Sequence, residues 1–295
     1  MSPPARRLPI RDPQPAAEPP SADAFAKEQA LVAWLRTRGR VAIGFSGGVD
    51  SAYLACVAVD ALGAEGTLAI IGRSASYPAE QWATARGVAG RFAVPVLEID
   101  TSEIEDPRYA ANPTNRCYFC KTELWSLLVP AAAARGIGTV IDGTNADDLG
   151  DHRPGAAAAR EHGVESPLAT LGFTKGEIRA LSRARGLPTW AQPSSPCLSS
   201  RIPYGTTVTP ERLAQVERAE RALRELGIEG DMRVRHHGDL ARVELSRELL
   251  AAWLVAPARQ RLVGAVRGAG FSRVALDLRG FRSGSLNVLS GVTAA

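Results

Sequence analysis

The sequence has no apolar run that approaches the roughly 20 residues a bilayer-spanning helix requires, and we expect no membrane-spanning segment. Its four cysteines among 295 residues are too few for a secreted scaffold that relies on disulfides. The formal net charge is +4, but no basic stripe is interleaved with aromatic residues, which excludes the usual footprint of a nucleic-acid-binding surface. These absences favour a cytoplasmic protein with reduced thiols, no membrane contact and no nucleic-acid partner.

Two changes in pattern divide the chain. Residues 1–22 are rich in Pro, Ala and Arg without an apolar block, so we expect a disordered tail rather than a secretory signal. Residues 23–196 alternate short apolar runs with helical patterns, which predicts a doubly wound, mostly parallel α/β sheet. Residues 197–295 then turn to amphipathic helices, including one expected at 251–268, and alternating strands. We expect a smaller α+β C-terminal domain that contacts substrate or other subunits.

The most informative stretch is Ser-Gly-Gly-Val-Asp-Ser at 46–51, between a predicted strand at 41–45 and a predicted helix at 52–62. It contains no lysine and therefore no Walker A motif, and it is not a Gly-x-Gly-x-x-Gly turn. Small residues before a helix N-terminus favour a bound phosphate. An ordinary strand-to-helix turn capped by Ser46 or Asp50 is the alternative. The phosphate-binding candidates are Ser46, Gly47, Gly48, Asp50 and Ser51.

Other polar residues follow predicted strand ends, where ligands bind in parallel sheets. Arg73, Ser74 and Gly143 are therefore further nucleotide-binding candidates. Asp147, or its neighbour Asp148, has the hard oxygen donors that Mg²⁺ prefers, although either carboxylate can equally cap the next segment.

A lysine stands at the start of a later predicted helix. Thr174 and Glu177 have the spacing of a capping box, which places Lys175 at the helix N-terminus and directs it toward a phosphate. A solvated surface lysine is the alternative. We therefore count Lys175 among the candidate catalytic residues.

Three of the four cysteines form a candidate metal set. Cys117 and Cys120 have Cys-x-x-Cys spacing before a helix, and Cys197 lies in a loop rich in Pro and Ser. Three thiolates suit an iron–sulfur cluster with one iron open to a non-protein ligand. Zinc completed by His152 or His162 is the competing reading, and Cys197 can also be an incidental loop cysteine. Cys56 lies in an apolar helical run, where a small buried side chain is expected.

Arginines near the C-terminal domain are candidates for binding an acidic substrate. Arg233 and Arg235 lie two residues apart on one predicted strand and therefore share a face. Together with Arg201 they can hold carboxylates or a phosphate through paired hydrogen bonds. A solvated strand face or an oligomer interface is the alternative.

The 46–51 hexapeptide resembles the PP-loop of ATP pyrophosphatases, a superfamily that includes NAD synthetase, GMP synthetase, asparagine synthetase and tRNA-thiolating enzymes. The resemblance implies a HUP-like fold, in which the loop holds the β,γ-pyrophosphate of ATP and leaves the α-phosphate open to attack. Together with the blocks at 116–121, 151–155, 196–205 and 277–284, it is similar to the LarE family. That resemblance covers nearly the whole chain.

The LarE resemblance implies an ATP-dependent sulfur transferase that serves the nickel-pincer nucleotide of lactate racemase. In such a reaction ATP adenylates a carboxylate of a pyridinium dicarboxylate mononucleotide, and sulfur then replaces AMP. The three cysteines resemble the type of member that holds a 4Fe-4S cluster and takes sulfide from a donor. Cys197, Cys117, Cys120 and Lys175 are then the candidate catalytic residues, with Asp147 at Mg²⁺, in a homo-oligomer.

Three other functions remain open from the sequence. Some members of the family sacrifice the sulfur of a single cysteine, which here would be Cys197. A tRNA-thiolating PP-loop enzyme is a second alternative, although the chain shows no RNA-binding module. A nucleotide-sensing zinc protein without enzymatic activity is the third.

Overall fold

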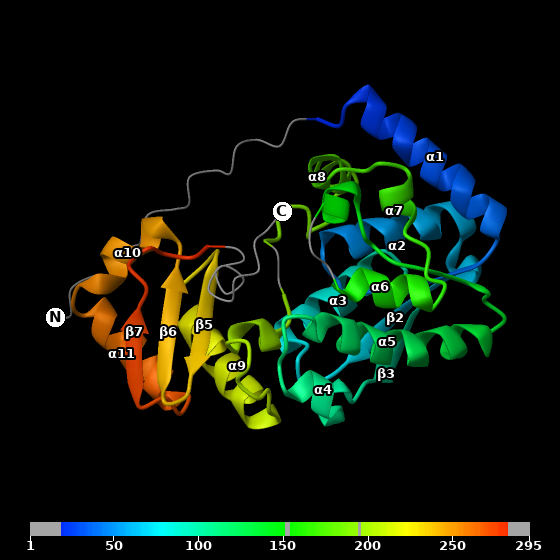
Figure 1. Ribbon diagram of the computed structural model, residues 1–295. Helices are drawn as coiled ribbons and strands as arrows, with labels where there is room; N and C mark the ends of the chain where they lie inside the picture. Colours follow the sequence, from blue (N-terminus) through cyan, green and yellow to red (C-terminus); the bar gives the residue numbers. More distant parts are fainter. Residues whose placement is uncertain (1–18, 151–153, 194–195, 283–295) are drawn as a thin grey trace.

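The computed structural model describes residues 19–150, 154–193 and 196–282, and its larger sheet is four-stranded and entirely parallel (Figure 1). The strand order is β3-β2-β1-β4. The strands are β1 (Val41–Gly44), β2 (Thr67–Arg73), β3 (Val96–Asp100) and β4 (Thr139–Ile141). The chain goes out along one side of β1 and returns to the other, so the switch point lies between β1 and β4.

Helices cover both faces of this sheet because its central strands are apolar on both sides. Val41 and Ile43 belong to one buried cluster, whereas Ala42 between them belongs to another. The first face packs against α1 (Ala22–Arg38), α2 (Val49–Leu62), α3 (Ala79–Arg91), α7 (Pro167–Thr170) and α8 (Lys175–Ala184). The second packs against α5 (Arg116–Ala133) and α6 (Pro154–Glu161). The predicted doubly wound α/β fold is thus confirmed.

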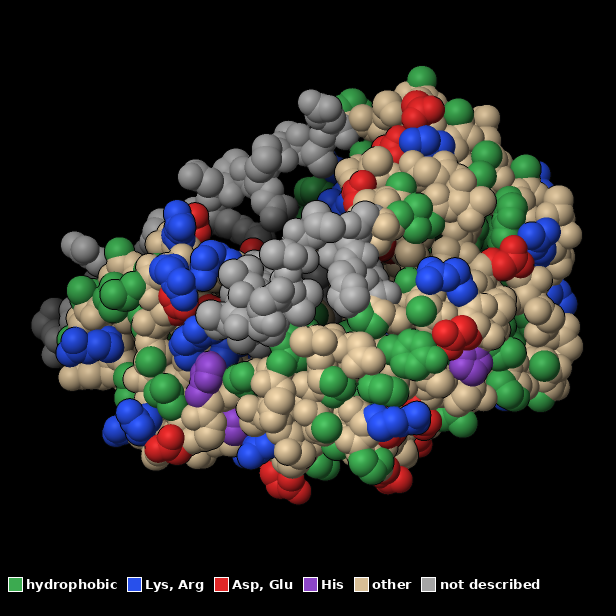
Figure 2. Space-filling model, in the orientation of Figure 1, with side chains coloured by type: hydrophobic (Ala, Val, Ile, Leu, Met, Phe, Trp, Pro, Cys, Tyr) green, Lys and Arg blue, Asp and Glu red, His purple; other side chains and the backbone are tan. Residues whose placement is uncertain are grey.

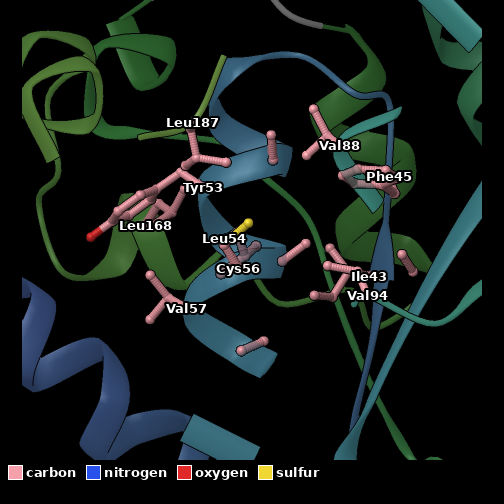
Figure 3. Close-up of a cluster of buried hydrophobic side chains, with 14 of the residues drawn as sticks. Ile43, Phe45, Tyr53, Leu54, Cys56, Val57, Val88, Val94, Leu168 and Leu187 are labelled. Carbon is pink, nitrogen blue, oxygen red and sulfur yellow. The ribbon is translucent and has the colours of Figure 1, made fainter. Parts of the chain in front are cut away.

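The helix that follows the 46–51 segment forms the centre of the first cluster. Figure 3 shows side chains of α2, among them Tyr53, Leu54 and Cys56, surrounded by residues of β1, α3 and α7. Cys56 is buried, and burial raises the pKa of its thiol to about 12. The expectation of a small buried side chain at this position is confirmed, and this thiol lies apart from the other three in sequence and in environment.

A second, three-stranded sheet lies toward the C-terminus (Figure 1). β5 (Met232–His237) and β6 (Leu240–Leu245) pair antiparallel, and β7 (Arg273–Leu276) pairs parallel to β6. Its apolar face packs against α9 (Pro210–Glu225), α10 (Arg247–Leu254) and α11 (Ala258–Gly268). The single helix expected at 251–268 is wrong, because Pro257 ends the pattern and two helices result. The domain boundary at residue 197 stays a prediction.

The segment that carries Cys197 is clamped to the segment before α5. The short helix η4 (Leu198–Arg201) follows Cys197, and Asn112 follows α4 (Pro107–Ala110). The buried Asn112 amide donates to three backbone carbonyls, those of Ile202 (3.3 Å), Pro203 (2.7 Å) and Thr206 (3.0 Å). Its backbone has φ +57°, a conformation that asparagine tolerates better than most residues. One side chain therefore fixes a loop about 90 residues away in the sequence.

The tail predicted at residues 1–22 lies largely outside the described residues. Residues 1–18 are not described, and α1 begins at Ala22 with the Ser21 hydroxyl accepting a hydrogen bond from Ala24 N at 3.1 Å. Within the described part of the chain, every helix is too short or too polar to cross a membrane. Three further 3₁₀ turns complete the description: η1 (Ala64–Gly66), η2 (Glu103–Glu105) and η3 (Ala146–Gly150).

Replacing Asn112 tests the clamp. Asn112→Gly accepts the positive φ but leaves one buried and two half-buried carbonyls without their donor, so we expect a loss of about 3 kcal/mol in the free energy of unfolding. Urea denaturation measures this loss. Asn115→Gly is the matched control, because Asn115 is exposed and its side chain makes no capping hydrogen bond at α5. Equal losses in the two variants would show that the clamp contributes nothing.

Candidate functional site

The 46–51 segment forms the turn between β1 and α2 and has room for backbone only. Gly47 has φ +68°, and a Cβ on it would lie 2.5 Å from the Ala85 Cβ on α3. Gly48 caps α2 with extended backbone, and no side chain in the described part of the chain caps this end. The Ser46 and Ser51 hydroxyls are 3.1 Å apart. The open helix N-terminus behind a glycine turn is an arrangement that suits an anion.

The loop after β4 lies against this turn. A Cβ on Gly143 would lie 2.9 Å from the backbone nitrogen of Ser51, so only glycine permits this approach. The Asn145 amide donates to the Asp50 carboxylate at 3.3 Å. Both loops follow strand ends at the switch point, as the sequence predicts, so the structure brings Gly143 together with the 46–51 segment.

Lys175 meets both loops from the N-terminus of α8. Its ammonium group forms an ion pair with Asp50, and its backbone nitrogen donates to the Asp147 carboxylate at 2.8 Å. The predicted capping box of Thr174 and Glu177 is confirmed and begins α8 at this residue. Two carboxylates and an ammonium group thus lie at the same edge of the sheet, beside the α2 N-terminus.

The candidate residues at the end of β2 contact other groups. Arg73 pairs with Glu98 on β3 at 3.3 Å and lies over the Trp82 ring at 5.4 Å. The Ser74 hydroxyl is 2.9 Å from that of Ser76, which donates to the buried Glu103 carboxylate at 2.6 Å. The assignment of Arg73 and Ser74 to the nucleotide stays a prediction. The neighbouring Ser76 instead contacts the segment that follows Cys197.

The three candidate cysteines come from two segments. Cys117 and Cys120 lie on the first turn of α5, where residues three apart share a face. Cys197 directly precedes η4, which is tied down by Leu198 N donating to Ser76 O at 2.8 Å and by Arg116 donating to Ser199 O at 3.1 Å. These bonds add to the Asn112 clamp and bring Cys197 toward the start of α5.

The electrostatics of the thiols agree with this convergence. Cys117 is solvent-exposed as a residue, but desolvation of its thiol by the surrounding groups raises its pKa, and the nearby Cys197 raises it further. Burial also raises the pKa of Cys120, as do the Glu103 carboxylate and, more weakly, Cys197 and Cys117. Burial of the Arg116 guanidinium tends to lower its pKa. The neighbouring Cys197 and Cys117 nevertheless hold that pKa above its ordinary value. Cys197 is therefore close enough to Cys117 and Cys120 to influence the pKa of both thiols.

Although the candidate cysteines lie near one another, the described residues do not form a complete site for a single metal ion. Among the described residues, no three His, Cys, Asp or Glu side chains form a group that can hold a single metal ion. His152, a candidate zinc ligand, lies outside the described residues, and His162 follows the end of α6.

A cavity of about 190 Å³ separates the helices of the two sheets. Its lining comes from α3, the 192–201 segment, α9 and the start of β5, and consists of Pro78, Glu80, Gln81, Thr84, Gln192, Pro193, Arg201, Glu220, Arg224, Gly230 and Arg233. The Gln81 amide donates to Ser46 O at 2.9 Å, and Arg201 donates to Cys197 O at 3.0 Å. The cavity wall therefore touches both the 46–51 segment and the Cys197 segment.

The three predicted arginines are all buried but differ in their surroundings. Arg201 pairs with Glu220 at 3.0 Å, and Arg235 pairs with Glu244 at 2.9 Å. Burial and the neighbouring Arg201 lower the pKa of Arg233 to about 10, so it remains charged at neutral pH. Arg201 and Arg233 line the cavity. On the face shown in Figure 2, Lys and Arg side chains gather at left, over the C-terminal part.

Several residues that build this site have little or no local signal in the sequence. Three of them act through contacts to distant residues. Asn112 binds the carbonyls of the 202–206 segment, and the Tyr109 hydroxyl lies 2.5 Å from that of Ser199. Gln81 binds the Ser46 carbonyl. Asn145 lies inside the Gly-Thr-Asn-Ala-Asp-Asp stretch at 143–148, and that stretch was the only available signal.

Gly143→Ala tests whether the two loops form one nucleotide site. The added Cβ forces the 143–147 loop away from Ser51, so we expect ATP-dependent pyrophosphate release to fall by about 100-fold. A Cβ at Gly138 meets nothing within 4 Å, which makes Gly138→Ala the matched control. A colorimetric pyrophosphate assay measures the rates, and equal rates in both variants would contradict the single site.

Comparison with known proteins agrees with the fold. The NAD synthase family model matches residues 30–115, which include the 46–51 turn. An uncharacterized protein of Synechocystis is 46% identical over 84% of this chain and 92% of its own length. One of Methanocaldococcus jannaschii is 27% identical over 83% of this chain and 91% of its own length.

A third relative identifies the family. The pyridinium-3,5-bisthiocarboxylic acid mononucleotide synthase of Lactiplantibacillus plantarum is 37% identical over 88% of this chain and 94% of its own length. The similarity thus covers nearly the full length of both chains, including the 46–51 turn and the cysteine-bearing segments. The chain belongs to the family of this synthase, the LarE family of PP-loop enzymes.

Proposed function

We propose that the protein is an ATP-dependent sulfur transferase that converts a carboxylate of a pyridinium dicarboxylate mononucleotide into a thiocarboxylate, for the nickel-pincer cofactor of lactate racemase. The observation that carries the proposal is the shared cavity. Gln81 in its wall binds the PP-loop at Ser46, and Arg201 in the same wall binds the backbone of Cys197. Residues that line this space of about 190 Å³ thus contact the backbone of both the PP-loop and the Cys197 segment.

The first half-reaction is adenylation. A substrate carboxylate oxygen attacks the α-phosphorus of ATP, the bond to the β-phosphate oxygen breaks, and pyrophosphate leaves. The N–H groups at the start of α2 hold the pyrophosphate, together with the Ser46 and Ser51 hydroxyls. Lys175, now paired with Asp50, neutralises the developing charge.

The carboxylates beside Lys175 fit a magnesium ion. Asp50 and Asp147 supply hard oxygen donors at the mouth of the phosphate turn, and both are within reach of the same lysine residue. Mg²⁺, when bound at Asp147, supplies positive charge against the triphosphate. In the structure Asp147 accepts a hydrogen bond from the Lys175 backbone, which orients its carboxylate.

The cavity arginines suit a substrate with carboxylates and a phosphate. Arg233 is buried beside Arg201, and its pKa is lowered first by burial and then by the positive charge of Arg201. An anion relieves that repulsion, and a guanidinium can bind a carboxylate through two parallel hydrogen bonds. Arg235 contributes by holding Ser200 O at 2.8 Å, which steadies η4 and the adjoining Arg201.

The donor set fits an iron–sulfur cluster better than a single zinc ion. The described residues form no group that can hold a single metal ion, and a four-iron cluster spaces its thiolates more widely than one zinc ion does. The pKa values of Cys117 and Cys120 are raised, so cluster binding at these thiols is coupled to proton release. A cluster held by Cys117, Cys120 and Cys197 supplies an iron without a protein ligand, where an extra sulfide can be held.

The second half-reaction exchanges oxygen for sulfur. Sulfide attacks the acyl carbon of the adenylated substrate, and AMP leaves with the former carboxylate oxygen. The product is a thiocarboxylate, with one oxygen replaced by one sulfur. Sacrifice of the Cys197 sulfur gives the same product but leaves dehydroalanine in the chain, so the fate of the protein separates the two routes.

Anaerobic turnover tests the proposal. The iron-loaded protein is incubated with ATP, Mg²⁺, sulfide and the pyridinium dicarboxylate mononucleotide, and mass spectrometry follows substrate and protein. We expect one exchange of oxygen for sulfur in the substrate, one pyrophosphate per exchange, and unchanged protein mass. Loss of sulfur from Cys197 would select the sacrificial route, and absence of both changes would overturn the function.

Cys117→Ala is the accompanying variant. It should abolish repeated sulfur transfer while pyrophosphate release continues, because Cys117 belongs to the thiol set and not to the phosphate turn. Cys56→Ala is the matched control, since Cys56 is buried in the core around α2 and should leave both activities in place. Repeated turnover in Cys117→Ala would contradict the cluster role.

A further inference from the structure

The Ser46 carbonyl is held by two side chains from one side. The Tyr77 hydroxyl and the Gln81 amide each donate to it at 2.9 Å. Because a peptide unit is planar and trans, fixing this carbonyl also fixes the Gly47 N–H, which points the opposite way. Gly47 has φ +68° and packs against Ala85, so its backbone has little other freedom. Gln81 and Tyr77 therefore aim one N–H donor of the PP-loop.

Gln81 differs from Tyr77 because its other end is also engaged. It is only 5% exposed, and its Oε1 accepts a hydrogen bond from Gln192 Nε2 at 2.9 Å. A primary amide that donates at one end and accepts at the other cannot rotate without losing both bonds. The orientation of Gln81 is therefore set jointly by the PP-loop and by Gln192.

Gln192 connects this amide pair to the cavity and to α8. Its backbone carbonyl accepts from Arg179 at 2.9 Å, and Arg179 lies one turn along α8 from Lys175. Gln192 and Gln81 both line the cavity. The buried Gln192 Oε1 has no hydrogen-bond partner within the described part of the chain. A buried acceptor without a donor is costly, and a ligand hydroxyl is the group that would satisfy it.

We propose that Gln81 is a positioning residue that couples substrate binding in the cavity to nucleotide binding at the PP-loop. A ribose hydroxyl of the substrate donates to Gln192 Oε1 and fixes the Gln192 amide. That amide holds Gln81, which holds the Ser46 carbonyl and so aims the Gly47 N–H at the pyrophosphate. The inference rests on the proposed function, because the substrate in question is the mononucleotide. Its consequence is that each ligand tightens the binding of the other.

Calorimetry with an α,β-methylene analogue of ATP, which resists cleavage at the reacting bond, measures this coupling. The dissociation constant of the analogue is determined with and without the pyridinium dicarboxylate mononucleotide. In the unaltered protein we expect the substrate to tighten analogue binding about tenfold. In Gln81→Met, which keeps the volume but removes the amide, that factor should fall to nearly one. Gln192→Met should show the same loss.

Tyr77→Phe is the matched control. It removes the other donor to the same Ser46 carbonyl but does not touch Gln192. We expect Tyr77→Phe to weaken binding of the analogue, whereas the roughly tenfold coupling remains. A purely structural role of Gln81 would not separate these two effects in this way. If both ligands bind but the factor is the same in Gln81→Met as in the unaltered protein, the inference is overturned while the function stands. If either ligand fails to bind the unaltered protein, the function itself fails.

Discussion

The contact on which the site depends is the clamp between Asn112 and the carbonyls of residues 202–206. Cys197 follows the start of α5 by about 80 residues, and nothing in the local sequence holds it there. Asn112, Arg116 and Tyr109 anchor the 198–206 segment from one side, and Ser76 anchors it from the other. Because these groups are buried and paired, moving the segment would leave several polar groups unsatisfied, which makes its position costly to change.

The nucleotide end depends on a different constraint, the close approach of two loops at the switch point of the sheet. Glycine at 143 lets the β4 loop touch the start of α2, and Asp50, Asn145 and Lys175 then meet across that contact. Gln81 and Arg201 both line the cavity. Gln81 contacts the 46–51 turn, and Arg201 contacts the backbone of Cys197. The cavity thus lies between α3, whose Gln81 contacts the 46–51 turn, and the arginines Arg201 and Arg233 of the C-terminal part.

The sequence predicts the sheet, its helices and the phosphate turn because these follow from periodicity and glycine placement, as the alternation of Val41, Ala42 and Ile43 between two cores illustrates. The helix expected at 251–268 divides at Pro257, a local signal that the prediction overlooked. Contacts between distant segments carry no such signal. Asn112 and Gln81 have no local signature, because their roles consist of bonds to residues many positions away.

The central claim is that Cys197 lies beside the thiols at the start of α5, and bis-alkylation tests it most directly. The metal-free protein carrying Cys56→Ala is treated anaerobically with a short reagent that bridges two thiols, and peptides are mapped by mass spectrometry. The account predicts bridges from Cys197 to Cys117 or Cys120. Recovery of Cys197 only as a singly alkylated residue, with bridges confined to Cys117 and Cys120, would contradict it.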